Sequence, residues 1–345
     1  MKKTFSTALH VVFTGPLKVE LLEREVGELQ PHEVLVQTRL TLISTGTELT
    51  VLRGGHTPGS HWDQAFSYPW NAGYCNVGVI LKTGETVSRF KTGDRVASTG
   101  PHASIFIISQ EDCSVIPNKV SDDEAVFATI AQIVMQGVRL ANIALGENVV
   151  ICGLGLLGQL TIALARHVGA WPVIGVDLEP FRRQMALNMG ATDVTGPSLA
   201  VELIRQYTNN ELGDVVFEVT GNPMAIPSSL EWVRKMGRFV MVSSPTGPTT
   251  VDFHDLVNAR GTVIIGAHNF THPTVPNEYN RWTRQVDTDL YLHLVEAGLL
   301  KVSRLITHRF PSSRAAEAYG QLLIDRALSL GVVLNWDEEN IKLVK

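Results

Sequence analysis

Cysteine is scarce in this chain. Its 345 residues include only Cys75, Cys113 and Cys152, which are far apart and odd in number, and no Cys-x-x-Cys pair occurs. A disulfide framework is therefore not expected, and a zinc site of four cysteines is excluded. Unpaired cysteines are typical of a reducing compartment, so we expect a cytoplasmic protein.

An excess of charge of one sign is also lacking. The chain carries 29 basic and 34 acidic residues, which gives a formal net charge of −5. Because a basic excess is the usual footprint of nucleic-acid binding and of polybasic membrane attachment, we expect neither a nucleic-acid partner nor a membrane surface as partner.

Long hydrophobic runs are absent as well. The most apolar stretch, residues 149–165, is short and rich in glycine, which argues against a membrane span. Lys2 and Lys3 open the chain as they would open a secretory signal, but His10 and Gly15 interrupt the segment that follows. We therefore expect no signal peptide.

What is present is a globular composition, with 44% hydrophobic and 18% charged residues. The length suggests about two domains. The first 120 residues are typical of strands and turns, with strand-like runs at 11–13 and 33–38 and turn signals at 83–85 and 91–95. Residues 53–73 form a loop rich in glycine, proline and aromatic residues, and such long loops often belong to functional sites.

The pattern changes at Ser121. The run Ser121-Asp122-Asp123-Glu124 is a capping box with acidic residues in the first turn, and it predicts a helix that continues to Ala141. Strands and helices then alternate, which indicates a parallel sheet and an α/β fold class. In this part of the chain the predicted strands are 149–152, 173–176, 215–219, 239–242 and 263–265, and the predicted helices are 156–167 and 180–189. After Gly266 the pattern breaks, and we predict helices at 287–297 and 312–326 and a closing strand at 331–334.

A glycine motif stands at the first of these strand-to-helix junctions. The run Gly153-Leu154-Gly155-Leu156-Leu157-Gly158 has the GxGxxG pattern of dinucleotide-binding loops. Asp177 ends the next strand, about 20 residues further on, where a carboxylate binds ribose hydroxyls and repels a 2′-phosphate. We therefore predict NAD as the cofactor, although Arg182 and Arg183 on the following helix would weaken this preference. The alternative is a glycine-rich turn in an α/β domain that binds no nucleotide.

Six further runs belong to a recognisable pattern: 31–36, 90–97, 145–151, 190–194, 219–222 and 315–319. With the glycine motif, they resemble the medium-chain dehydrogenase/reductase superfamily over nearly the whole chain. The resemblance implies a GroES-like β-rich catalytic domain, residues 1–122 and 267–345, and a Rossmann domain with a doubly wound parallel sheet, residues 123–266. It also implies an active site between the two domains and a homodimer or homotetramer.

The chain departs from the zinc enzymes of this superfamily at the metal ligands. Thr45 stands where a cysteine is expected, Tyr74-Cys75 where histidine and glutamate are expected, and neither Cys nor Glu stands near Thr129. We therefore expect no catalytic zinc, although Cys75 and Glu48 leave an unconventional site open with the histidines His56, His61 and His102. The runs 42–48 and 127–141 resemble threonine-dehydrogenase-like and bi-domain oxidoreductases, and polyols, sugars and cyclitols are plausible substrates across that branch.

Without a metal, side chains must polarise the substrate oxygen and handle its proton. The resemblance places Thr47 in a proton relay and Tyr74 at a lost ligand position, where its phenol can donate. Glu48 is a candidate base or ribose ligand, and His56 lies in the loop expected to cover the substrate. The alternatives are a turn hydroxyl for Thr47, a packed side chain for Tyr74, a structural ion pair for Glu48 and a solvent-facing ring for His56.

Further residues are expected to contact substrate or cofactor. Trp62 and Trp70 offer an apolar wall for a sugar face, although tryptophans in loops usually pack. His268 and Asn269 follow the last Rossmann strand, which in this fold approaches nicotinamide and substrate. The residues expected at the cofactor are Gly153, Gly155, Leu156, Leu157, Gly158, Asp177, Arg182, Thr220 and Ser243.

The sequence thus predicts an NAD(H)-dependent oxidoreductase that transfers hydride between nicotinamide and a secondary alcohol or ketone, without catalytic zinc. A polyol, sugar or cyclitol is the expected substrate class. One alternative is an NADPH-dependent enone or quinone reductase, against which Asp177 argues. The other is a non-catalytic nucleotide-binding subunit or sensor, because a fold does not guarantee a function.

Overall fold

The computed structural model describes residues 7–278 and 280–336. The chain divides into two compact units, which we describe separately. The first unit comprises the chain up to Thr129 and the chain from Thr288 onward, and the second unit comprises Ile130–Asp287. The domain limits predicted from the sequence assign residues 123–129 and 267–287 the other way, and those limits remain predictions.

The first unit contains two sheets. A three-stranded sheet has the order β2-β1-β4, and a seven-stranded sheet has the order β15-β16-β3-β5-β6-β8, with β7 paired to β3. The predicted turns at 83–85 and 91–95 lie at the end of β5 and at the start of β6. The strands are β1 Thr7–Gly15, β2 Lys18–Glu25, β3 Glu33–Leu42, β4 Trp70–Asn71, β5 Asn76–Thr83, β6 Arg95–Ser98, β7 Ile105–Ser109, β8 Cys113–Val115, β15 Ile306–Pro311 and β16 Gly331–Asn335.

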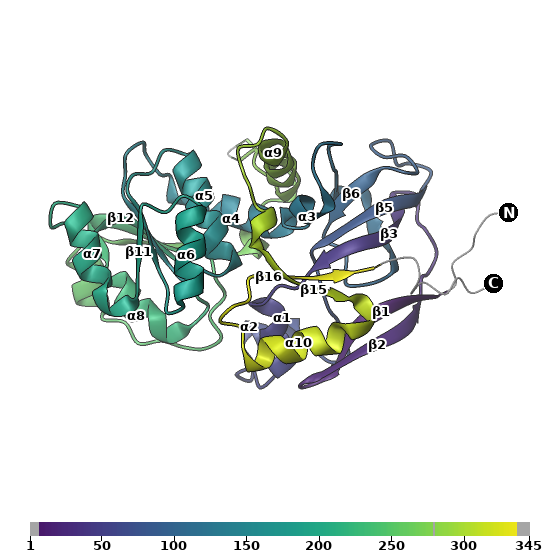
Figure 1. Cartoon of the computed structure of the whole chain (residues 1–345), viewed down its shortest axis with the longest axis horizontal. Helices are drawn as coiled ribbons and strands as arrows, with labels where there is room; N and C mark the ends of the chain where they lie inside the picture. Colours follow the sequence, from purple (N-terminus) through teal and green to yellow (C-terminus); the bar gives the residue numbers. More distant parts are fainter. Residues whose placement is uncertain (1–6, 279, 337–345) are drawn as a thin grey trace. The chain divides into compact units, whose positions relative to one another are not determined.

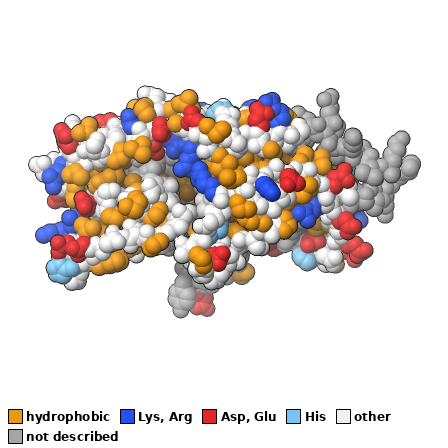
Figure 2. All heavy atoms as spheres, turned by 90° about the horizontal axis from the view of Figure 1, so that it is seen from below, with side chains coloured by type: hydrophobic (Ala, Val, Ile, Leu, Met, Phe, Trp, Pro, Cys, Tyr) orange, Lys and Arg blue, Asp and Glu red, His pale blue; other side chains and the backbone are white. Residues whose placement is uncertain are grey.

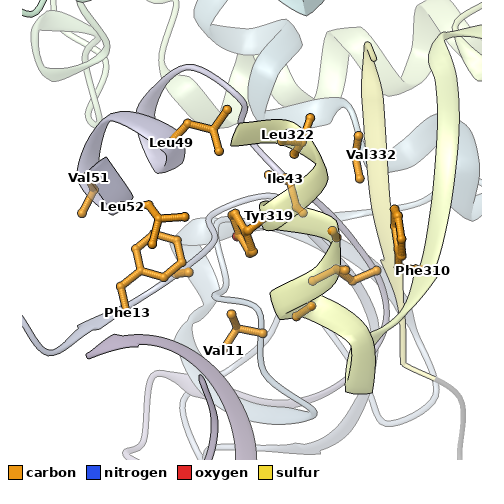
Figure 3. Packing of buried hydrophobic residues seen from close by; sticks show 14 of the residues in the cluster. Val11, Phe13, Ile43, Leu49, Val51, Leu52, Phe310, Tyr319, Leu322 and Val332 are labelled. Atoms are coloured by element: carbon orange, nitrogen blue, oxygen red, sulfur yellow. The ribbon is translucent and has the colours of Figure 1, made fainter. Parts of the chain in front are cut away.

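The core of the first unit joins both ends of the chain. Helix α10 (Ala315–Ile324) lies alongside β1 and β2 (Figure 1). Its Tyr319 is fully buried among Phe13, Leu52 and Ile43 (Figure 3), and the rings of Tyr319 and Phe13 meet edge-on with centroids 5.1 Å apart. Because full burial of one such apolar side chain stabilises by roughly 1.5–3 kcal/mol, this cluster holds α10 against the first strands.

The second unit is built on a six-stranded parallel sheet with the order β11-β10-β9-β12-β13-β14. In chain order this is 3-2-1-4-5-6, the order of a doubly wound dinucleotide-binding fold, so the predicted fold class is confirmed. Strands β9 and β10 are completely buried, as expected for strands covered on both faces. The strands are β9 Val149–Cys152, β10 Val173–Val176, β11 Asp193–Thr195, β12 Gly213–Glu218, β13 Val233–Met241 and β14 Val263–Gly266.

The helix predicted from Ser121 to Ala141 is two helices. Ser121 caps α3 (Asp122–Ala125) through the predicted capping box, but α4 covers only Ala128–Ala141. At the break, Phe127 N donates to Glu124 O, three residues back, at 3.4 Å. The prediction of one long helix was wrong because the acidic cap indicates where a helix begins and says nothing of its continuity. The other helices are α1 Thr47–Arg53, α2 His61–Ala65, α5 Leu156–His167, α6 Pro180–Asn188, α7 Ala200–Tyr207, α8 Ile226–Leu230 and α9 Arg284–Glu296.

The surface agrees with the balanced charge of the sequence. On the face shown in Figure 2, acidic and basic side chains are interspersed among apolar ones rather than gathered by sign. Within residues 7–278 and 280–336, no helix has the length and apolar character needed to cross a membrane.

Candidate functional site

The glycine motif forms the turn between β9 and α5. Gly153 has a φ of 98°, which favours glycine, and a Cβ at Gly158 would lie 2.0 Å from Gly153 O. Glycine at these two positions therefore permits the turn and its close contact with α5. At Gly155, by contrast, a Cβ would meet no atom within 4 Å. This middle glycine leaves open space at the N-terminus of a twelve-residue helix, where backbone N–H groups favour an anion such as a pyrophosphate.

Asp177 follows β10 at the carboxyl end of the sheet. Its Oδ2 accepts a hydrogen bond from Leu154 N (2.6 Å), and its Oδ1 accepts one from Glu179 N (2.8 Å). A carboxylate has about four acceptor positions, so these bonds fix the group and leave capacity for two ribose hydroxyls. The buried Gln159 ties the same loop to α6, because its Nε2 donates to Leu154 O and to Arg182 O, both at 2.9 Å.

The remaining residues predicted around the glycine loop line the same turn. Leu156 is buried and Leu157 is half-buried in the first turn of α5. The side chain of Arg182 is half-buried on α6, and its neighbour Arg183 donates to the carbonyls of Asp177 (2.8 Å) and Leu178 (2.9 Å). The loop therefore fits a dinucleotide, and its preference between NAD and NADP remains a prediction.

A second carboxylate, Glu218, ends β12 beside β9. It is fully buried, and it accepts hydrogen bonds from the Thr220 hydroxyl, the Ser243 hydroxyl and Thr220 N, the last at 2.7 Å. Its register partner on β9 is Cys152. Burial, followed by the nearby Glu218, raises the pKa of the Cys152 thiol to about 12, so this cysteine stays protonated.

His268 and Asn269 follow β14. His268 Nδ1 accepts from Phe270 N at 3.2 Å, and Asn269 Oδ1 accepts from Gln132 Nε2 at 3.3 Å. Arg284 also donates to Asn269 O at 2.7 Å, which ties this segment to the start of α9. The segment is thus anchored within the second unit, and its contact with substrate remains a prediction.

Glu48 lies in the first turn of α1 and is fully buried. Its Oε1 accepts from Ser44 N at 2.8 Å, and its Oε2 lies 3.0 Å from His102 Nε2 and accepts from the Tyr319 hydroxyl. The backbone of His102 lies close to Gly73, which has a φ of 95°. A Cβ at position 73 would lie 2.5 Å from His102 N, so glycine there leaves room for His102. A buried carboxylate requires such donors, and a role of Glu48 as a base or ribose ligand remains a prediction.

Thr47 and Tyr74 belong to a chain of three hydroxyl groups. The Tyr74 hydroxyl donates to Thr47 Oγ1 at 3.2 Å and is also hydrogen-bonded to Ser44 Oγ. Ser44 follows β3, Thr47 opens α1 and Tyr74 precedes β5, so the fold brings three segments together. Because each hydroxyl both donates and accepts, the chain can pass a proton from one end to the other.

Ionisation is suppressed around this chain. Burial raises the pKa of the Tyr74 phenol well above its usual range, and the nearby Cys75 and Glu48 raise it further. Burial and Glu48 likewise raise the pKa of the Cys75 thiol. At neutral pH, therefore, Tyr74 is a phenol and Cys75 is a thiol.

The residues at the expected metal position do not fit zinc. Thr45 and Tyr74 supply neutral hydroxyls, and Cys75 is a buried thiol hydrogen-bonded to the Thr129 side chain. Within the described ranges, no group of three or more His, Cys, Asp or Glu side chains is placed to hold a metal ion. Because zinc in proteins is held by thiolate, imidazole or carboxylate groups, this donor set suits hydrogen bonding instead.

The predicted loop of residues 53–73 contains α2, β4 and a series of aromatic rings. The ring of His56 stacks on Trp62 with centroids 5.7 Å apart, and Phe66 contacts both Trp62 (5.4 Å) and Trp70 (5.5 Å). Trp70 in turn lies 5.4 Å from Phe13, and both tryptophans pack against the core cluster of Figure 3. Packing accounts for these contacts, and a role of His56, Trp62 or Trp70 at the substrate remains a prediction.

Sequence reasoning missed Ser44, Tyr319 and Glu218. Ser44 belongs to no recognised chemical motif, and Tyr319 is separated by 271 positions from Glu48, so only the fold brings that pair together. Glu218 carried a usable signal, because it is an acid at the carboxyl end of a buried parallel strand. The same signal identified Asp177.

Comparison with known proteins gives matches along most of the chain. The model of the alcohol dehydrogenase GroES-like domain matches residues 30–154, and that of the zinc-binding dehydrogenase matches residues 157–285. The chain is 29% identical over 341 residues to an L-threonine 3-dehydrogenase of Marinomonas sp., covering 89% of this chain and 93% of that protein. It is 27% identical over 350 residues to a D-guloside 3-dehydrogenase of Shigella flexneri, covering 93% and 99%.

Solved structures share the fold. A Sinorhizobium meliloti protein bound to NADP superposes with a TM-score of 0.77 at 19% identity, and an alcohol dehydrogenase of Escherichia coli complexed with NADH with a TM-score of 0.79 at 18% identity. In both cases the match covers 96% of this chain and 99% of the other. With the two matched domain models, the sheet order and the glycine turn, these findings establish that the chain belongs to the medium-chain dehydrogenase/reductase superfamily, whose members use nicotinamide cofactors.

Proposed function

We propose that this chain is an NAD(H)-dependent oxidoreductase that acts on a secondary alcohol or its ketone, without catalytic zinc. A polyol, sugar or cyclitol is the proposed substrate class, which the likeness to a D-guloside dehydrogenase supports. The observation that carries the proposal is the chain of hydroxyls from Ser44 through Tyr74 to Thr47. Its Tyr74 stands at a position where the resemblance to the zinc enzymes leads us to expect a metal ligand.

The cofactor half of the proposal rests on the second unit. The open space at Gly155 and the helix N-terminus of α5 suit a pyrophosphate, and Asp177 suits the hydroxyls of an unphosphorylated adenosine ribose. When bound there, the nicotinamide ring would accept or deliver the hydride. NADPH-dependent reduction of an enone or quinone remains the competing activity, and tighter binding of NADPH than of NADH would favour it.

The hydroxyl chain would handle the proton of the reaction. In the orientation observed, Tyr74 donates to Thr47, so the Thr47 hydroxyl can give its own hydrogen to a ketone oxygen that is being reduced. The Thr47 proton is then replaced from Tyr74, and a proton from solvent water must restore the chain. Rotation of the hydroxyl groups reverses the direction for oxidation of an alcohol. Because the pKa of Tyr74 is raised, its phenol stays protonated at neutral pH. We therefore propose that it relays a proton and does not act as a phenolate base.

Glu48 is proposed as the residue that positions this chain of hydroxyl groups. It is buried away from solvent, and its Oε1 holds the backbone N–H of Ser44, the residue whose hydroxyl meets Tyr74. Burial is the main cause of the raised pKa of Tyr74, and Glu48 adds to it.

Turnover measurements test the proposal directly. Reduction of NAD should be followed over a panel of polyols and sugars for the wild type, Tyr74→Phe and Thr47→Val. We expect each variant to lose about 100-fold in kcat, the usual scale of proton-transfer catalysis, with the affinity for NADH unchanged. Thr50→Val is the matched control, because Thr50 lies on the same helix and its hydroxyl bonds to Gly46 O.

Two results would count against the proposal. Turnover in Tyr74→Phe and Thr47→Val equal to that of Thr50→Val would remove the hydroxyl chain from the mechanism. Binding of NADH by a wild-type protein that turns over no member of the panel would favour the non-catalytic alternative.

We also propose a homodimeric or homotetrameric assembly and a cytoplasmic location. Strand β14 is an edge of the parallel sheet, and its Val263 and Ile264 are exposed. An exposed apolar edge strand is a ready template for pairing with a second copy. Sedimentation of the wild type and of Ile264→Lys tests the assembly, since a charge on this edge should favour the monomer.

A further inference from the structure

The hydroxyl groups of Thr220 and Ser243 both donate their hydrogen bonds to Glu218, within the second unit. Glu218 accepts hydrogen bonds on both carboxylate oxygens: the Thr220 hydroxyl donates to Oε1 and the Ser243 hydroxyl donates to Oε2. A carboxylate can only accept hydrogen bonds, so it cannot donate one to either hydroxyl oxygen. Both hydroxyl groups are therefore held with their hydrogens turned toward the buried acid.

The oxygens of these hydroxyls consequently offer acceptor positions only. Thr220 Oγ1 also accepts from Asn222 N at 2.9 Å, which leaves it one lone pair, whereas Ser243 Oγ keeps two. Thr220 is exposed and Ser243 is half-buried, so both can be reached by a ligand, while Glu218 behind them is fully buried.

This arrangement selects the chemistry of what binds. A phosphate or carbonyl group offers only acceptor oxygens, so it could not form hydrogen bonds with the acceptor oxygens of Thr220 and Ser243. The carboxylate of Glu218 would also repel an anion. A neutral diol carries two O–H donors, so it can satisfy Thr220 and Ser243 together. The pair therefore suits a sugar hydroxyl group and disfavours a phosphate.

Sheet topology indicates which sugar this is. Asp177 and the glycine turn follow β10 and β9, which belong to the half of the sheet that holds the adenosine nucleotide. Thr220 and Ser243 follow β12 and β13, in the other half of the sheet, where the second nucleoside of a dinucleotide lies.

We propose that Glu218 is a positioning residue that makes Thr220 and Ser243 an acceptor pair for the ribose diol next to the nicotinamide. The proposal rests on the proposed function, because it assumes a nicotinamide dinucleotide as ligand. Glu218 itself touches no ligand and acts through the two hydroxyl groups.

Three ligands of increasing size separate this role from a merely structural one. ADP occupies only the adenosine half, ADP-ribose adds the second ribose, and NADH adds the nicotinamide. In Glu218→Gln, the amide NH2 would donate to one hydroxyl and turn its proton outward. Calorimetric titration should show unchanged ADP binding, and binding of ADP-ribose and NADH weakened about tenfold, the scale of one lost hydrogen bond.

Ser243→Ala provides a second variant that keeps Glu218. It removes the acceptor itself, so it should give the same pattern across the three ligands even if Glu218→Gln fails to fold. Ser228→Ala is the matched control, since the hydroxyl of Ser228 bonds to Ala225 O at 3.1 Å, and it should bind all three ligands as the wild type does.

The outcomes are distinct. Wild-type affinity for ADP-ribose in Glu218→Gln and Ser243→Ala would overturn this inference and leave the proposed function intact. Equal weakening of all three ligands would also overturn it, since Glu218 would then merely support the shape of the turn. A wild-type protein that binds neither ADP nor NADH would overturn the proposed function and this inference with it.

Discussion

Three buried polar contacts of the first unit converge on Glu48. Its carboxylate takes hydrogen bonds from Ser44 N and the Tyr319 hydroxyl and meets His102 Nε2, all away from solvent. His102 Nδ1 has no hydrogen-bond partner among the described residues, so Glu48 is the side chain that holds this ring. One acid thus links α1, α10 and the loop that carries His102.

We predict that Glu48→Ala lowers the free energy of unfolding by about 3 kcal/mol, because it leaves buried donors without an acceptor. Glu48→Gln should lose less, since the amide oxygen still accepts. Denaturant titration followed by tryptophan fluorescence measures both, with exposed Glu23→Ala on β2 as control. A loss in Glu48→Ala no larger than in the control would contradict this reading.

His10 gives the protein a sensitivity to acid. Burial, followed by the nearby Arg24, lowers the pKa of His10 from 6.5 to about 4. Above pH 6.5 the ring is neutral in both folded and unfolded states. Between pH 6.5 and 4 the unfolded chain takes up a proton that the folded protein refuses, so the free energy of unfolding falls as the pH falls.

We predict that His10→Gln makes the fall in Tm between pH 6.5 and 4 shallower than it is in the wild type. Calorimetric scans across that range provide the measurement, and His254→Gln, at an exposed position, is the control. Parallel Tm curves for His10→Gln and wild type would show that His10 contributes nothing to acid sensitivity.

Single residues were predictable where a local motif carries their chemistry. Asp177 and the three glycines follow from the spacing of a strand, a turn and a helix. Ser44 and Tyr319 were not predictable in this way, because their contacts join segments whose proximity only the tertiary fold creates. For Glu48 the residue was identified, but its complete burial depends on α10 and was not visible in the sequence.

At the scale of elements, the turn between β9 and α5 separates two roles of glycine. Gly158 is required for packing, since a Cβ would lie 2.0 Å from Gly153 O. Gly155 is not, because a Cβ there meets open space and its φ of −69° suits any residue. The free space at Gly155 is therefore available to a ligand.

We predict that Gly155→Ala keeps the wild-type Tm but binds NADH at least tenfold more weakly, because the added methyl group stands where the pyrophosphate approaches. Gly158→Ala should instead lower the free energy of unfolding by about 2 kcal/mol or more, an overpacking cost. Thermal scans and NADH titrations of both variants check the contrast. Equal NADH affinity in Gly155→Ala and wild type would place the dinucleotide elsewhere.

The sequence predicted the presence of many of the strands and helices, but it did not predict where one helix ends and the next begins. The strands β9, β10 and β14 and the helices α5 and α6 follow from hydrophobic runs and their punctuation by glycine and proline. The break between α3 and α4 was missed because the acidic cap of α3 marks only the start of a helix, and the apolar run that follows it continues a helical pattern. The short α2 was missed in the loop of residues 53–73, where its Ser60 cap was the available signal.

At the scale of the whole molecule, the first unit is built from both ends of the chain. Strand β16 pairs with β3, and Tyr319 of α10 bonds to Glu48 of α1. Composition and periodicity gave no indication that the C-terminal part of the chain packs against the N-terminal part. The resemblance to the superfamily implied it, since no local pattern tells a strand near the C-terminus which sheet it joins.

We propose that this superfamily member oxidises an alcohol with a chain of hydroxyl groups in place of a zinc ion. Turnover of NAD with a polyol substrate should be measured after exhaustive dialysis against a chelator, with the metal content of the same sample determined by mass spectrometry. We predict undiminished turnover at a negligible zinc content, and its loss in Tyr74→Phe. Turnover that disappears on chelation and returns in proportion to added zinc would contradict the account.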